Sequence, residues 1–189
     1  KMHNAHVAAH AHGIQGIKNA FKAGVSTIEH GTYIDKSGAR LLAKKGIPIV
    51  PTLMVIDTLY HHGEYLDSEK KAKVKELNKV QKENKAVAYA EGVKMFMGTD
   101  SGVIPHGNNL KELQFLVELG MDPSEAIAAG TIEPAKFLGC GDKIGSVEPM
   151  KVADVILVDK NPLEDISSLA DSNNVSLVIQ DGHVIKNIF

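Results

Sequence analysis

Strand-like and helix-like segments alternate along most of this chain, and this order constrains its fold more than any other feature. The strand-like runs cover residues 5–13, 25–31, 47–53 and 92–100. Segments with apolar residues at helical spacing follow at 13–24, 35–46, 67–91 and 108–120. Such alternation predicts an α/β fold, because parallel strands need crossover connections that helices usually supply. The two common closures are a doubly wound sheet and a (β/α)8 barrel.

The pattern changes after residue 145. Before that point, two further short helices are expected, at 121–130, where Asp122 and Glu125 form a capping box, and at 131–139. Short strands then follow at 153–159, 175–182 and 183–189. The last two meet at an Asp-Gly pair, which predicts a hairpin. We therefore divide the chain into an α/β part, residues 1–145, and a small β appendage, residues 146–189.

Composition excludes several classes of protein. The 189 residues are 43% hydrophobic and 23% charged, and the formal net charge is -2, so nothing favours binding to nucleic acid or to an anionic membrane. No apolar run is long enough to cross a bilayer. The single Cys140 is typical of a reducing compartment and predicts a cytoplasmic protein; a signal peptide upstream of Lys1 stays open.

The lysine-rich segment 67–91 is typical of a solvated helix rather than of a binding patch. Its apolar residues recur at helical spacing and predict one buried stripe. They are Val74, Leu77, Val80 and Val87.

Imidazoles and a carboxylate stand where three of the predicted strands end. His10 and His12 end the first strand, His30 the second and Asp100 the fourth. His6 shares the even register of the first two and would pack deeper or orient a neighbour. Chemistry in α/β proteins gathers at the carboxyl ends of parallel strands, and these side chains are ligands for zinc and related metals. The sequence therefore predicts a metal site at this edge.

These motifs resemble the C-terminal half of the amidohydrolase superfamily, nearest to its imidazolonepropionase-like and Xaa-Pro dipeptidase-like branch. The segments that carry the resemblance are "VAAHAHG", "TIEHGTYID", "VPTL", "MGTDSG", "MDPSEAIAAGTIEPAKFLG" and "IGSVEPMKVADVILVDKNPLEDI". The resemblance implies strands 5–8 of a metal-dependent (β/α)8 barrel and part of a β-sandwich appendage. One departure is Met150-Lys151, where the family usually has Gly-Lys, and it weakens a turn of the appendage.

The resemblance also implies a ligand set. His10 would correspond to the family's strand-5 ligand, His30 to its strand-6 ligand and Asp100 to its strand-8 ligand. These residues would hold one or two Zn2+ ions, and Asp100 would serve as general acid and base for a metal-activated water. His10-Ala11-His12 could instead be the family's strand-1 His-x-His pair, but only three further strands precede the β appendage, which favours strand 5.

Three further residues are candidates for substrate contact: His12, Tyr33 and His106. For each of them, ordinary strand-end or loop polarity is an equally good explanation.

The predicted function is hydrolysis of C-N bonds in small substrates such as dipeptides or cyclic amides. A barrel of this type needs roughly 250 residues, so the chain should pair with a missing N-terminal half-barrel or with a second copy of itself. The alternative is a catalytically silent fragment that acts as an oligomeric or assembly module with a partial metal site. A flavodoxin-like binding domain ranks last, because "HGIQG" is a poor phosphate loop.

Overall fold

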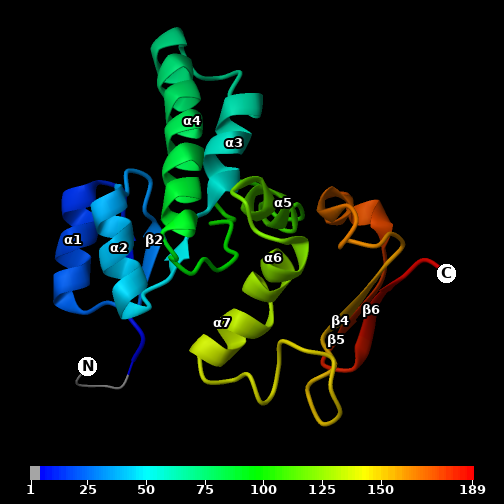
Figure 1. Cartoon of the computed structure of the whole chain (residues 1–189). Helices are drawn as coiled ribbons and strands as arrows, with labels where there is room; N and C mark the ends of the chain where they lie inside the picture. The colour runs from blue at the N-terminus through cyan, green and yellow to red at the C-terminus, as the bar shows by residue number, and fades with distance from the viewer. Residues whose placement is uncertain (1–4) are drawn as a thin grey trace. The chain divides into compact units, whose positions relative to one another are not determined.

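The computed structural model describes residues 5–189 of the chain. It consists of two compact units, the first ending at Pro105 and the second spanning His106–Phe189 (Figure 1). The described helices include none that combines the length and the apolar character needed to cross a bilayer.

The first unit contains the predicted parallel sheet. Its strands are β1 (Ala8–Ala11), β2 (Thr27–His30) and β3 (Ile49–Val50), in that order. The strand expected at 92–100 is reduced to one parallel bridge between Met95 and Ile49, in which the amide of Phe96 donates to the carbonyl of Ile49 at 2.9 Å. The first strand is also shorter than expected, so His6 precedes it and His12 follows it. The sheet confirms the α/β class and the order of its parallel segments.

Helices α1 (Ile14–Ala23) and α2 (Lys36–Lys45) match the predicted segments and lie side by side (Figure 1). Each ends at a glycine in the left-handed conformation, Gly24 or Gly46. Ile28 of β2 and Leu42 of α2 are fully buried and belong to the core that the two layers share.

Helix α3 (Leu53–His62) was not predicted from the sequence. Thr52 precedes it in the left-handed conformation and makes no side-chain capping bond, so the usual signal of a helix start is missing.

Helix α4 (Ser68–Ala90) packs against α3 (Figure 1). Of the four apolar residues expected to form its buried stripe, Val74, Leu77 and Val80 are half-buried and only Val87 is exposed. Val87 is 43% exposed, whereas Gln81 and Lys85 are 2% and 0% exposed. The C-terminal half of this helix therefore buries polar side chains.

The second unit begins with helices α5 (Lys111–Glu118), α6 (Pro123–Ala129) and α7 (Ile132–Phe137). The capping box predicted for α6 is present, with Asp122 and Glu125 in their expected roles. Two 3-10 turns, Ile166–Ala170 and Ser172–Asn174, lie between strands that form an antiparallel sheet in the order β4-β5-β6. The strands are β4 (Val155–Val158), β5 (Val175–Gln180) and β6 (His183–Asn187), and the last two form the predicted hairpin.

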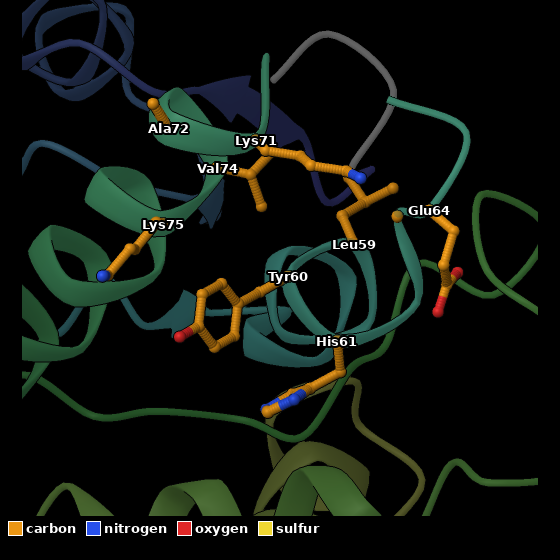
Figure 2. Close-up of a pocket in the computed structure, with 9 residues that line it drawn as sticks. Leu59, Tyr60, His61, Glu64, Lys71, Ala72, Val74 and Lys75 are labelled. Atoms are coloured by element: carbon orange, nitrogen blue, oxygen red, sulfur yellow. The ribbon is translucent and has the colours of Figure 1, made fainter. Parts of the chain in front are cut away.

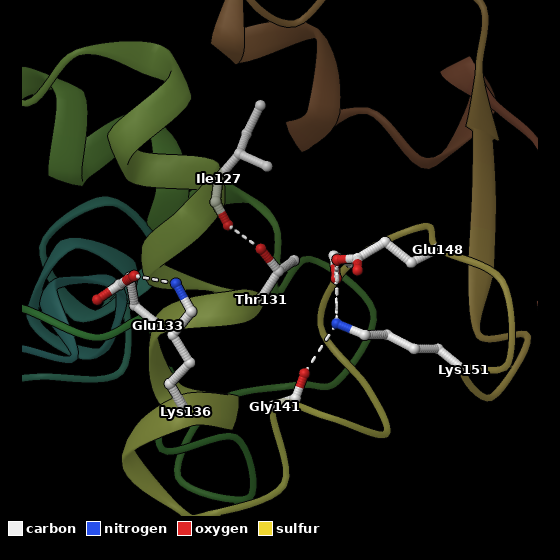
Figure 3. Close-up of polar contacts among 8 residues, drawn as sticks. Ile127, Thr131, Glu133, Lys136, Gly141, Glu148 and Lys151 are labelled. Carbon is white, nitrogen blue, oxygen red and sulfur yellow. Dashed lines mark hydrogen bonds and ion pairs between the residues drawn. The ribbon is translucent and has the colours of Figure 1, made fainter.

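Lys151 ties the loop between α7 and β4 together (Figure 3). Its ammonium donates to the carbonyl of Gly141 at 2.8 Å and to the carboxylate of Glu148 at 3.1 Å. The boundary expected at residues 145 and 146 falls inside this loop, within the second unit. That boundary separates the β appendage from the α/β part by structural class, and it stays a prediction.

Candidate functional site

Three imidazoles meet at the carboxyl ends of β1 and β2. The Nε2 atom of His30 lies 2.9 Å from the Nδ1 atom of His10. The ring of His12 stacks on that of His30 with centroids 4.7 Å apart, and it meets the ring of His10 edge-on at the same separation. One ligand nitrogen from each residue falls within 4.8 Å of the others. The parallel register places Ala11 opposite His30, which brings the two strand ends together.

Two threonines orient these rings, and sequence reasoning missed both. The hydroxyl of Thr32 lies 2.8 Å from Nδ1 of His12, and the hydroxyl of Thr52 lies 2.7 Å from Nδ1 of His30. Both threonines are buried. A hydrogen bond to one ring nitrogen fixes the orientation of an imidazole and leaves the other nitrogen for a ligand. The only available signal was a threonine two positions after each strand end, in "HGT" and "VPT".

Backbone strain is concentrated around the same edge. His30, Thr52 and Asp100 have φ values of 65°, 50° and 52°. This left-handed region is unfavourable for residues other than glycine, and most of all for a β-branched residue such as threonine. Strained residues of this kind cluster at functional sites, where the surrounding structure enforces them.

Asp100 shares a cavity of about 350 Å³ with two of the imidazoles. The residues that line it are His10, Glu29, His30, Val50, Thr52, Gly98 and Asp100. Burial, followed by the neighbouring rings of His12 and His10, lowers the pKa of His30 to about 4, while the charge of Asp100 acts in the opposite direction. Burial also lowers the pKa of His12. His12 and His30 are therefore neutral near pH 7, which is the form that binds metals.

The imidazole cluster fits a divalent cation. Imidazole nitrogens suit zinc and other first-row metals. A contact of 2.9 Å between nitrogens of His10 and His30 requires a proton on one of them, whereas a cation would satisfy both lone pairs. Among the described residues, the clustered ligand atoms are those of His10, His12 and His30, and the carboxylate of Asp100 is not part of the cluster. The metal role of Asp100 and the substrate role of His12 stay predictions.

The remaining candidates lie outside this cluster. Tyr33 is 45% exposed in the loop after β2, and its amide donates to the carbonyl of His12 at 2.9 Å. His106 belongs to the second unit. His6 is exposed and precedes β1. Substrate contact by Tyr33 and His106 stays a prediction.

A larger cavity of about 510 Å³ lies elsewhere in the first unit, between α3 and α4 (Figure 2). Tyr60 and His61 line it from α3, and Lys71 and Lys75 from α4. Most of these side chains are exposed, and within residues 5–189 the clustered metal ligands are those at the strand ends. We therefore place the candidate site at the smaller cavity.

Comparison with known proteins shows the family of this chain. The amidohydrolase family model matches residues 1–185. Ochratoxinase from Aspergillus niger is 38% identical over 186 residues, which cover 97% of this chain and 38% of the relative. An imidazolonepropionase from Thermoplasma volcanium is 31% identical over 96 residues, or 50% of this chain and 24% of the relative.

A solved structure extends the similarity to the fold. The crystal structure of a Xaa-Pro dipeptidase with methionine in its active site aligns with a TM-score of 0.86 and 39% identity, covering 98% of this chain and 46% of that one. The chain thus spans less than half the length of these relatives. The similarities confirm the resemblance that the sequence motifs indicated.

Proposed function

Because this chain belongs to the amidohydrolase family, we propose that it supplies the metal-binding strands of a hydrolase that cleaves amide bonds in small, dipeptide-like substrates. The observation that carries this proposal is the meeting of three imidazoles at the ends of parallel strands, beside a cavity that Asp100 also lines.

Each residue has a distinct part in the proposed reaction. His10 and His30 would hold the cation, as the sequence predicts, and His12 would be a third ligand, in place of the substrate contact expected for it, because its ring nitrogen belongs to the same cluster. We propose that the cation is zinc because all three donors are imidazoles. A bound zinc ion polarises a carbonyl and lowers the pKa of water towards 7. The carboxylate of Asp100 accepts the proton of the attacking water and returns it to the departing amine.

The substrate class rests on the relatives. One is named as a Xaa-Pro dipeptidase and carries an amino acid, methionine, in its active site. An amino acid is the product expected from hydrolysis of a dipeptide. The similarity to an imidazolonepropionase keeps cyclic amides as a second group of substrates to test.

We also propose that the α/β part, residues 1–145, is one half of a (β/α)8 barrel. Its parallel segments follow one another in sequence order, as in a barrel. Strand β1 is hydrogen-bonded to β2 on one side and forms the edge of the sheet on the other. Edge strands recruit further strands, and the partners would come from a segment outside this chain or from a second copy. Residues 146–189 would then form part of a β-sandwich.

The test is turnover of a panel of Xaa-Pro and N-acyl dipeptides by the protein, alongside the Asp100→Asn variant. Asparagine tolerates the left-handed backbone at this position, so the substitution removes the charge with little strain. Asp142→Asn changes an exposed carboxylate of the second unit and serves as the matched control. We expect turnover that Asp100→Asn abolishes and the control retains. No turnover by any of the three proteins would favour the silent assembly module.

A further inference from the structure

Helix α4 holds the carboxyl end of β2 through two adjacent side chains. The ammonium of Lys85 donates to the carbonyl of Gly31 at 2.8 Å, and the side-chain amide of Asn84 donates to the carbonyl of Thr32 at 3.0 Å. Lys85 is fully buried and Asn84 is half-buried. A buried ammonium is costly, and a well-packed apolar residue would often serve stability better at such a position. The placement of Lys85 therefore calls for a role beyond packing.

The two carbonyls belong to residues that set the positions of two imidazoles. Gly31 follows His30, and both residues are left-handed, with φ values of 62° and 65°. The amide of Gly31 donates to Ala11 of β1 at 2.9 Å, so this turn is held on one side by β1 and on the other by Lys85. A left-handed histidine persists only where its surroundings enforce that conformation.

Thr32 links the same helix to the second imidazole. Its carbonyl accepts from Asn84, and its hydroxyl lies 2.8 Å from Nδ1 of His12. A displacement of residues 31 and 32 would therefore move the ring of His30 and the hydrogen-bond partner of His12 together.

We propose that Lys85 and Asn84 are positioning residues, which clamp the 31–32 turn and so hold the rings of His30 and His12 in the arrangement that binds the cation. This inference rests on the proposed metal site for its function, but the clamp itself is a property of the chain without metal. Helix α4 thereby acts on the site through the 31–32 turn, without contributing a ligand.

The test compares Lys85→Met with Ala88→Gly. Methionine keeps an unbranched stem and removes the ammonium. Ala88 lies one turn further along the same buried face, and its methyl group cannot hydrogen-bond. The glycine variant therefore controls for loosening of the helix.

Two readouts separate positioning from general stability. The first is the set of ring-nitrogen NMR signals of the histidines in metal-free protein, assigned with single His→Asn variants. The second is Zn2+ affinity by titration. We expect Lys85→Met to shift the signals of His30 and His12 and to lower Zn2+ affinity about 10- to 100-fold, the range found when supporting contacts of metal ligands are lost. Ala88→Gly should change neither.

The proposal is overturned if Lys85→Met leaves the ring signals unchanged, or shifts them no more than Ala88→Gly does. If the unaltered protein binds no Zn2+, the proposed function fails, but the metal-free signals still decide whether the clamp exists. If Lys85→Met does not fold, Asn84→Ala is measured in the same way. Ring signals for His12 that match the unaltered protein would then refute the clamp.

Discussion

Nε2 of His30 lies 2.9 Å from Nδ1 of His10, although the two residues are 20 positions apart and stand on different strands. The contact exists because the parallel register of β1 and β2 brings their carboxyl ends to one edge. Thr52 holds the other nitrogen of the His30 ring, so its orientation is fixed from two sides.

The stability of the metal-free protein should fall as the pH is lowered from about 6.5 to about 4. The pKa of His30 is lowered from 6.5 to about 4, chiefly by burial. Between these values the unfolded chain binds a proton at this residue that the folded chain does not, and acid therefore favours unfolding. Urea denaturation at several pH values measures the effect. His30→Asn, which suits the left-handed backbone, should flatten the profile; an unchanged slope would contradict the assignment.

Removal of the Thr52 hydroxyl should weaken metal binding more than it weakens the fold. Thr52→Val keeps the branched shape but cannot bond to Nδ1 of His30, so the ring loses its support. We expect Zn2+ affinity to fall about 10- to 100-fold. Thr52→Ser retains the hydroxyl and should retain most of the affinity. Equal losses in both variants would mean that the branched shape, rather than the hydrogen bond, matters.

Gly98→Ala should destabilise the first unit and disturb Asp100. A Cβ atom at residue 98 would lie 2.3 Å from Cγ1 of Val50, so the Val50 side chain or the segment that carries it must shift. Overpacking of this kind costs about 1–3 kcal/mol in free energy of unfolding. Gly13→Ala is the control, because its added Cβ would meet nothing within 4 Å. Thermal unfolding of both variants gives the comparison, and similar midpoints would refute the predicted clash.

Met150→Gly should stabilise the second unit. Met150 has a φ value of 72° and is 99% exposed, so its side chain contributes no packing to offset the backbone cost. Relief of a left-handed conformation is worth roughly 1 kcal/mol. Met150→Ala keeps the unfavourable conformation and should show no gain in chemical denaturation. A glycine variant no more stable than the alanine variant would be evidence against backbone strain at this turn.

The parts of the site that lie on a regular pattern could be predicted from the sequence. His10 and His30 stand where alternating apolar runs end, and parallel strands bring such ends together. The partners that orient them could not be predicted in this way. Thr32 and Thr52 act through contacts across 20 and 22 positions, which depend on the strand register.

Lys85 illustrates a second reason why sequence reasoning fell short. In a lysine-rich helix it looked like part of a solvated face, whereas its side chain is buried against the turn that follows β2. The hydrophobic pattern of a helix predicts that charged residues are exposed. It therefore cannot predict a charged residue that is buried and hydrogen-bonded to a backbone carbonyl. The start of α3 was not predicted for a related reason. The hydroxyl of Thr52 is hydrogen-bonded to His30 and does not cap the helix.

The most direct test of the account is a Zn2+ titration of the metal-free protein and of its single His10→Asn, His12→Asn and His30→Asn variants. His183→Asn, an exposed histidine of the second unit, is the control. We predict saturable Zn2+ binding that each of the three site substitutions weakens strongly and the control leaves intact. Binding that survives all three substitutions unchanged would contradict a metal site at the ends of β1 and β2.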